Sequence, residues 1–278
     1  MGSSQADKVS ELSRLCTALR RDILEMITAA GSGHPGGSLS AVDIIACLYE
    51  HALKHDPKQP LWPDRDRFVL SKGHGVPALY AVLAHRGYFD RSQLVSLRTL
   101  GSLLQGHPVV KTVPGIEACT GSLGQGLSVA QGIALAAALD AKTYNVYCML
   151  GDGEIQEGQI WEAAMSAAKY KVDNLIAIVD QNRGQIDGFV DEVMPLEPLA
   201  DKWKAFGWQV TTIDGHDYTQ ILESLGWATQ RSGCPKVIIA HTVKGKGVSF
   251  MENNIGWHGV APTMEQLERA LQELGSNV

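Results

Sequence analysis

The feature that most constrains this chain is the turn Gly151-Asp152-Gly153, which directly follows the apolar run from Val146 to Leu150. A second apolar run, from Leu175 to Asp180, is followed closely by Asn182. If the two runs are neighbouring parallel strands, Asp152 and Asn182 emerge side by side at the carboxyl edge of one sheet, where open α/β folds bind ligands. The flanking glycines would let the backbone approach such a ligand closely.

The oxygen atoms at this edge suit a hard divalent cation. A carboxylate, an amide oxygen and a backbone carbonyl are typical Mg²⁺ ligands, and Mg²⁺ fills its remaining positions with water and phosphate oxygens. The residues alone leave a simpler interpretation open, in which a strand and a tight turn lead into a helix with an aspartate near its N-terminus.

The order of apolar runs predicts the fold class. Strand-like runs alternate with segments of helical length, which predicts an α/β fold with a mainly parallel sheet and helices on both faces. The expected strands are Phe68 to Leu70, Val146 to Leu150, Leu175 to Asp180, Trp208 to Ile213 and Val237 to His241. The expected helices include a first one carrying apolar positions from Leu12 to Ala30, then Leu123 to Ala141, Gln156 to Tyr170, Tyr218 to Gln230 and an end helix capped by Thr263 and Gln266.

Composition narrows the class of protein. A chain of 278 residues with 45% apolar content suits one large domain or two small ones, and we favour one domain, residues 1–278. Its formal charge is −6 with no basic stripe, so nucleic acid is not an expected partner. No apolar run approaches membrane-spanning length, and no signal core opens the chain. Five cysteines without a C-x-x-C pair suit a reducing compartment, so we expect a cytoplasmic protein without membrane partners.

Four of the nine histidines stand in distinctive settings, mostly flanked by glycine. They are His34 in GHPGG, His74 in SKGHG, His107 in GHP and His258 in GWHG. Such loop histidines are well placed to touch a ligand and to move protons near neutral pH, although each one alone is more typical of a satisfied surface or core residue. His51 and His55 are expected on one helical face without the glutamate of a zinc motif, and therefore solvated.

Together these motifs resemble the transketolase family. The resemblance rests on GDGE with QEG at 156–158, on Asp180-Gln181-Asn182, on Gln185-Ile186-Asp187-Gly188 and on the four histidine contexts. It covers the chain from about Leu12 to the end helix, and it implies thiamine diphosphate held through Mg²⁺, with Ca²⁺ or Mn²⁺ as substitutes.

The resemblance also implies roles for individual residues. The metal ligands would be Asp152, Asn182 and the main-chain carbonyl of Gly184. His34, His107 and His258 would face the sugar hydroxyls and the reactive carbon. The cofactor contacts would be His74, Gly121, Ser122, Leu123, Gly153, Asn182, Ile186, Lys244 and His258. Several relatives have a bulkier apolar residue where this chain has Gly184, so we expect a loop that is less rigid in isolation.

The family places its essential glutamate and its phosphate-binding cations on a second, pyrimidine-binding domain, which follows the region matched here. We therefore expect this chain to be the diphosphate-binding subunit of a split transketolase. Its partner would be a separate C-terminal subunit carrying the pyrimidine-binding domain, and a homodimeric core would complete a heterotetramer. The assembled enzyme would transfer a two-carbon ketol unit between small sugar phosphates.

Other interpretations remain at this point. Within thiamine chemistry they are a deoxyxylulose phosphate synthase or a 2-oxo acid decarboxylating subunit. Outside it, Asp152 would serve a metal-dependent phosphohydrolase, but Asp152 has no second acidic partner in a D-x-D, and the sequence has no Gly-x-Ser-x-Gly elbow. A catalytically silent binding homologue is the third alternative.

Overall fold

The structure is a computed structural model, and it describes residues 5–275 of the chain. Five strands form one sheet in the order β1-β2-β3-β7-β6, and every neighbouring pair is parallel. The strands are β1 (Arg67–Leu70), β2 (Val146–Gly151), β3 (Leu175–Gln181), β6 (Gln209–Asp214) and β7 (Lys236–His241). All five expected strands are confirmed, each to within a residue at its ends.

The central strands are buried on both faces, which explains their unbroken apolar character. In β2, Tyr147 and Met149 point into one hydrophobic core, while Val146, Cys148 and Leu150 point into the other. This alternation follows the period of two along a strand. Because both faces need cover, helices must pack on each side of the sheet.

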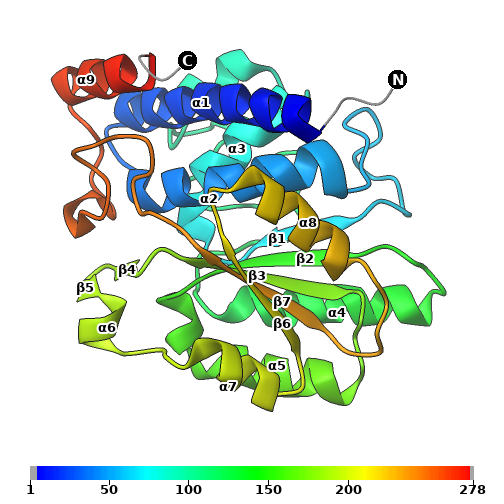
Figure 1. The fold of residues 1–278 in the computed structure, drawn as a ribbon. Helices are drawn as coiled ribbons and strands as arrows, with labels where there is room; N and C mark the ends of the chain where they lie inside the picture. The colour runs from blue at the N-terminus through cyan, green and yellow to red at the C-terminus, as the bar shows by residue number, and fades with distance from the viewer. Residues whose placement is uncertain (1–4, 276–278) are drawn as a thin grey trace.

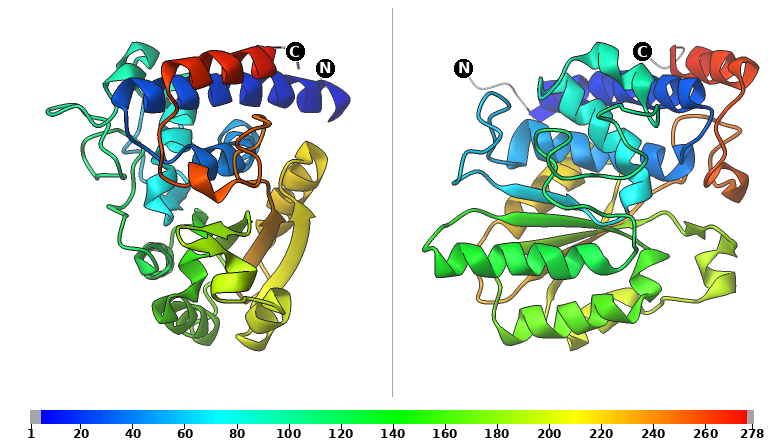
Figure 2. Two further views of the ribbon diagram at one scale, coloured as in Figure 1. Left: turned by 90° about the vertical axis from the view of Figure 1, so that its left-hand side faces the viewer. Right: turned by 180° about the vertical axis from the view of Figure 1, so that it is seen from behind.

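Helices indeed cover both faces, as the views in Figures 1 and 2 show. One face carries α1 (Gln5–Ala30), α2 (Pro35–Cys47), α3 (Val76–His85), α8 (Tyr218–Ala228) and α9 (Met264–Gly275). The other face carries α4 (Gln125–Leu139), α5 (Gly158–Lys169) and α7 (Leu199–Ala205). The predicted mainly parallel sheet with helices on both faces is therefore confirmed.

The ends of two helices bear on the sequence expectations. At α9, the Thr263 N–H donates to Gln266 Oε1 over 2.8 Å and the Gln266 N–H donates to Thr263 Oγ1 over 3.2 Å, so the capping box is confirmed. After α2, the π-helical turn Leu48–Ala52 ends before His55.

The expectation for His55 was wrong, because His55 does not share a helical face with His51. Its ring nitrogens lie 2.9 Å from the Tyr88 hydroxyl and 2.8 Å from the Tyr49 carbonyl oxygen, so this half-buried ring is held by the protein rather than by solvent.

Within residues 5–275, no helix is both long and apolar enough to cross a membrane.

Candidate cofactor and metal site

A cavity of about 310 Å³ opens at the carboxyl ends of β1, β2 and β3. Its lining combines residues from segments far apart in the chain. The lining residues are His34, Lys72, His74, His107, Gly121, Leu123, Gly151, Asp152, Gly153, Glu154, Asn182, Gly184, Gln185, Ile186, Lys244 and His258. Every residue singled out from the sequence as a site residue is among them except Ser122, which lies exposed next to Gly121.

Strand register brings Asp152 and Asn182 to the same cavity. β2 and β3 pair with Gly151 opposite Asp180, and the Asp152 N–H continues the ladder by donating to the Asp180 carbonyl oxygen over 3.3 Å. The Asp152 carboxylate accepts the Gly153 N–H over 2.8 Å and also the N–H of Arg183, the residue after Asn182. The two turns are thus joined directly.

The third predicted oxygen, the Gly184 carbonyl, faces the same space. Asn182 Oδ1 accepts the Gly184 N–H over 3.1 Å, and the Gly184 carbonyl oxygen accepts from the Lys244 ammonium over 3.2 Å. A Cβ added to Gly184 would lie 2.7 Å from Lys244 Cδ and 2.8 Å from Ile255 Cδ1. The side chains of Lys244 and Ile255 therefore occupy the space that a larger residue would need, and they pack this buried turn in place.

The carboxylate, amide and carbonyl oxygens form a donor set for a hard cation such as Mg²⁺. Among the described residues, no three histidine, cysteine or acidic side chains gather to hold a metal ion. Any metal in this cavity would thus depend on Asn182 and the main chain as well as on Asp152. Burial, followed by the nearby charge of Asp180, raises the pKa of Asp152 to about 6, so an added cation would relieve an unfavourable negative charge.

Beneath the cavity, Asp180 organises a buried polar network. Its carboxylate pairs with the Lys72 ammonium and accepts from the Thr242 hydroxyl, from Ser40 Oγ over 2.7 Å and from Asn182 Nδ2 over 3.3 Å. Burial alone opposes ionisation of this carboxyl, but the Lys72 charge and these hydrogen bonds hold its pKa below the ordinary value. The network fixes the Asn182 amide with its nitrogen toward Asp180.

Three of the predicted histidines form a cluster in the wall of the cavity. The ring centroid of His34 lies 5.2 Å from that of His74 and 5.6 Å from that of His258, and His74 and His258 stack at 5.4 Å. Burial, then the Arg98 charge, lowers the pKa of His34 to about 4; burial, then Lys244, lowers that of His258 to about 3. Burial also lowers the pKa of His74 and of His107. All four rings are neutral near pH 7, so each has one donor and one acceptor nitrogen.

Two of these rings, His34 and His258, differ in the hydrogen bonding of their Nδ1 atoms. His34 Nδ1 is buried and has no hydrogen-bond partner, which is unusual for a buried polar atom. His258 Nδ1 lies 3.1 Å from the Lys244 ammonium, which can only donate, so its proton sits on Nε2. The cavity thus offers the His258 imidazole N–H to a polar ligand, while His34 Nδ1 is buried beneath the surface of the cavity.

Glycine-rich backbone forms the wall next to His107. Gly121 has φ +147°, and a Cβ there would lie 3.2 Å from the His107 ring. A Cβ on Gly73 would lie 2.8 Å from the Thr120 carbonyl carbon, so the SKGHG and TGS turns pack backbone against backbone. On the rim, Leu123 is 39% exposed and Ile186 is 70% exposed, which leaves apolar surface available to a flat ring or to another chain.

Sequence reasoning missed the roles of Lys72, Asp180 and Glu154. The sequence suggests no chemistry for Glu154 beyond a place at a helix start, but its carboxylate is buried and accepts the N–H groups of Gly151 and Gly124, both over 3.0 Å, and the Ser71 hydroxyl. It ties three cavity segments together. The only available signal was the position of these residues inside or next to the motifs.

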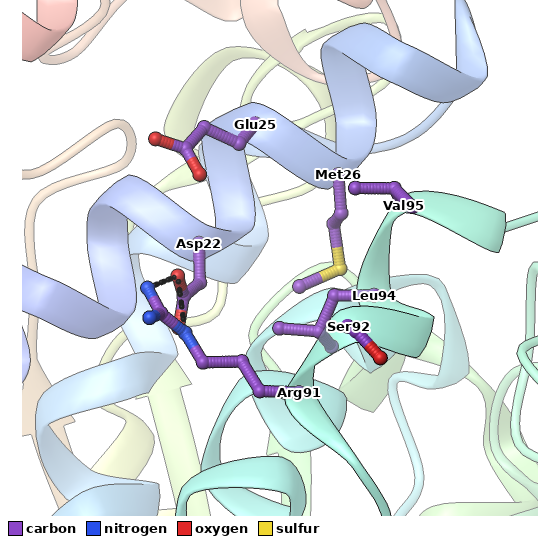
Figure 3. A pocket seen from close by; sticks show the side chains of 7 residues that line it. All are labelled: Asp22, Glu25, Met26, Arg91, Ser92, Leu94 and Val95. Atoms are coloured by element: carbon purple, nitrogen blue, oxygen red, sulfur yellow. Dashed lines mark hydrogen bonds and ion pairs between the residues drawn. The ribbon is translucent and has the colours of Figure 1, made fainter.

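A second hollow lies on the helical face, between α1 and the 3₁₀ segment Arg91–Ser96 (Figure 3). Its volume is about 340 Å³, but its two strongest polar groups, Asp22 and Arg91, are already paired with each other across it. It contains none of the predicted site residues. The cavity at the strand ends is therefore the candidate functional site.

Comparison with known proteins identifies the family of the chain. Residues 12–278 match the family described as "Transketolase, thiamine diphosphate binding domain". The chain is 47% identical to a 6-deoxy-6-sulfo-D-fructose transketolase subunit from a Clostridium species, over 95% of this chain and 96% of that protein. It is 44% identical to one subunit of an apulose-4-phosphate transketolase from Phocaeicola vulgatus, over 93% of this chain and 92% of that protein.

Longer proteins match as well. A solved transketolase from Campylobacter jejuni superposes with a TM-score of 0.89 at 38% identity, over 95% of this chain and 42% of that one. Human transketolase is 41% identical over 98% of this chain and 43% of its own length. The chain thus spans less than half the length of these transketolases and nearly the whole length of the two proteins named as subunits.

Proposed function

This chain belongs to the transketolase family of thiamine diphosphate-binding domains, and from that premise we propose that it is the diphosphate-binding subunit of a two-chain transketolase. The assembled enzyme transfers a two-carbon ketol unit from a ketose phosphate to an aldose phosphate. The observation that carries the proposal is the cavity at the strand ends, which gathers Asp152, Asn182, the Gly184 carbonyl and four histidines. The chain itself forms a single thiamine diphosphate-binding domain.

The chain's own residues first hold the cofactor. Asp152, Asn182 and the Gly184 carbonyl would bind Mg²⁺, for which Ca²⁺ or Mn²⁺ would substitute, and the backbone at Gly153 would contact the diphosphate. His74 and Lys244 add a neutral donor and a positive charge, and an ammonium is a suitable point charge for a phosphate. Gly121, Leu123 and Ile186 line the cavity and would contact the rings, together with Ser122, which lies exposed next to Gly121 outside the lining.

Thiamine diphosphate supplies the nucleophilic carbon and stabilises the carbanion when it is bound. The histidines of this chain then act on the sugar. His34, His107 and His258 orient its hydroxyls and move protons, because a neutral ring has one donor and one acceptor nitrogen, although in His258 the acceptor is already engaged by Lys244. The His258 Nε2–H, fixed by the Lys244 contact to Nδ1, is available to a substrate oxygen.

A separate partner completes the site. The two relatives named as transketolase subunits have nearly the same length as the matched region, which supports a split enzyme. The partner is a C-terminal subunit with the pyrimidine-binding domain, and two copies of each chain form a heterotetramer. The exposed Ile186 and Leu123 beside the cavity suit cover by another chain.

The substrates we propose are small sugars with an anionic end. The names of the two relatives mention a sulfonated fructose and apulose 4-phosphate, and both compounds are short sugars that carry one anionic group. The cytoplasm stays our prediction for the location, in keeping with five free cysteines in the chain.

The direct test mixes the purified chain with its partner subunit. Ketol transfer is measured with each chain alone and with both together, in the presence of thiamine diphosphate and Mg²⁺. We expect negligible turnover by either chain alone and a large gain on mixing, and we expect the Asp152→Asn variant to give no gain. Equal activity of this chain with and without the partner would contradict the proposal.

A further inference from the structure

A fully buried carboxylate, Asp43 on α2, accepts three hydrogen bonds away from the cavity. Arg20 Nη2 lies 2.6 Å from Asp43 Oδ2, His216 Nδ1 lies 2.7 Å from the same oxygen, and the Tyr218 hydroxyl donates to Oδ1 over 3.1 Å. Burial opposes ionisation, but Arg20 and His216 hold the pKa of Asp43 below its ordinary value. The group is therefore an ionised, fully paired buried charge.

Two of these partners reach on to one loop. We call residues 242–247, which follow β7, the Lys244 loop. The Val243 N–H donates to His216 Nε2 over 2.8 Å, and Arg20 Nε donates to the Lys246 carbonyl oxygen over 3.0 Å. Because a backbone N–H can only donate, His216 Nε2 must carry a lone pair, and its proton must lie on Nδ1, toward Asp43. Asp43 thus fixes both the tautomer of His216 and the direction of Arg20.

The Lys244 loop needs such anchors. Gly245 and Gly247 have φ values of +79° and +95°, so the loop is built from residues with wide conformational freedom. A backbone bond joins it to α2, from the Gly245 N–H to the Gly36 carbonyl oxygen over 3.0 Å. Between the two anchored positions, the Lys244 side chain is 2% exposed and directs its ammonium to Gly184 and His258 in the cavity.

We infer that Asp43, His216 and Arg20 are positioning residues that hold the Lys244 loop at both ends and so keep the Lys244 ammonium at the cofactor. None of the three lines the cavity, so they act only through the loop. The inference rests on the proposed function in one respect, the role of Lys244 as a contact for the diphosphate. The anchoring itself is a property of the isolated chain.

The anchoring is tested by hydrogen exchange of the isolated chain. His216→Phe keeps a ring but loses both hydrogen bonds, whereas in His216→Gln the amide oxygen can accept from Val243 and the amide nitrogen can donate to Asp43. We expect peptides covering the Lys244 loop to exchange roughly tenfold faster in His216→Phe, as loss of one net hydrogen bond implies. His216→Gln should restore most of the protection, and His51→Phe at an exposed site should change nothing.

The effect on the cofactor is measured in the assembled two-chain enzyme. For His216→Phe we expect the dissociation constant of thiamine diphosphate to rise about tenfold, following the displaced anchor, while KM for the sugar, which Lys244 reaches only through His258, rises less. His216→Gln should bring the dissociation constant back toward the wild-type value. A merely structural role of His216 would not change the dissociation constant of the cofactor more than KM for the sugar.

The outcomes are distinct. Exchange that is unchanged in the loop, or faster uniformly across all strands, would overturn the anchoring, and faster loop exchange with unaltered cofactor affinity would overturn the positioning of Lys244. If wild-type enzyme binds no thiamine diphosphate, the proposed function fails while the exchange result still decides the anchoring. If His216→Phe does not fold, Arg20→Lys takes its place, because it keeps the charge beside Asp43 and loses the Nε contact to Lys246.

Discussion

The ammonium of Lys72 pairs with the carboxylate of Asp180 beneath the cavity, and these side chains are 1% and 0% exposed. Each member of a buried ion pair depends on the other, because removal of one leaves the other charged, without a partner and out of contact with water. Here Ser40, Thr242 and Asn182 satisfy the remaining lone pairs of Asp180. The pair therefore supports the position of the Asn182 side chain at the base of the cavity.

Removing one member of this pair should lower the stability of the fold strongly. We expect Asp180→Ala to lower the free energy of unfolding by about 3–5 kcal/mol in urea titrations, because Lys72 is left buried and unpaired. The double variant Asp180→Ala/Lys72→Met should recover part of this loss. As a control, Asp191→Ala removes an exposed pair with Arg183 and should change the free energy by less than about 1 kcal/mol. A small effect of Asp180→Ala would mean that the pair does not support the base of the cavity.

Replacing Asp152 should separate stability from function. The pKa of Asp152 is raised from 3.8 to about 6, so its negative charge destabilises the empty chain at neutral pH, and this cost shrinks as the pH falls below about 6 and is gone below 3.8. We expect Asp152→Asn to remove this pH-dependent cost in urea titrations, although its amide can accept only one of the two N–H groups bound by Asp152, and to weaken Mg²⁺-dependent cofactor binding at least about a hundredfold by calorimetry. Undiminished binding would remove Asp152 from the metal site.

Much of this site could be predicted because its signals are local. Apolar runs followed by Gly-Asp-Gly and by Asp-Gln-Asn identify two strands and their turns, and parallel pairing then requires Asp152 and Asn182 to share an edge. The alternation of strands and helices likewise predicts the layered fold. The order of the strands, with β7 inserted between β3 and β6, has no local signal.

The remainder depends on contacts between distant segments. Helices α2 and α3 are buried on all sides, so their apolar residues show no helical period and their bounds could not be read from the sequence. The contact of His216 with Asp43 joins residues 173 positions apart. Glu154 follows a turn, as an exposed residue often does, and only the packed fold turns it toward the N–H groups of Gly124 and Gly151.

The tight turn at Gly184 gives a matched pair of glycine variants. Gly184→Ala should destabilise the isolated chain by about 1–3 kcal/mol, since the new methyl would collide with Lys244 and Ile255. Gly132→Ala, in the middle of α4 with no atom within 4 Å of the added Cβ, should stabilise it by about 0.5–1 kcal/mol. Urea unfolding of both variants measures the difference, and equal effects would mean that the turn is not packed as described.

The clustered histidines predict a pH dependence. The folded-state pKa values of His34 and His258 are about 4 and about 3, below the ordinary value of about 6.5 in an unfolded chain. Between pH 6.5 and 4 the unfolded chain binds more protons, so these groups make the fold less stable as the pH falls. Protonation of Asp152 makes the fold more stable as the pH falls over part of this range. The contribution of the histidines must therefore be measured by comparing variants with the wild type.

We expect His34→Gln/His258→Gln to lose less stability than the wild type when the pH is lowered from 7 to 5, as measured by the urea midpoint. The control is His241→Gln, an exposed residue at the end of β7, which should follow the wild type. Identical slopes in all three proteins would mean that His34 and His258 are not held as neutral rings in the fold.

A crystal of the chain with its partner, thiamine diphosphate and Mn²⁺ in place of Mg²⁺ tests the central claim most directly. The anomalous signal of manganese should lie roughly 2.1 Å from a carboxylate oxygen of Asp152, from Asn182 Oδ1 and from the Gly184 carbonyl oxygen, with diphosphate oxygens completing the coordination. A manganese peak elsewhere in the chain, or cofactor bound with no metal between these two strand ends, would contradict the account.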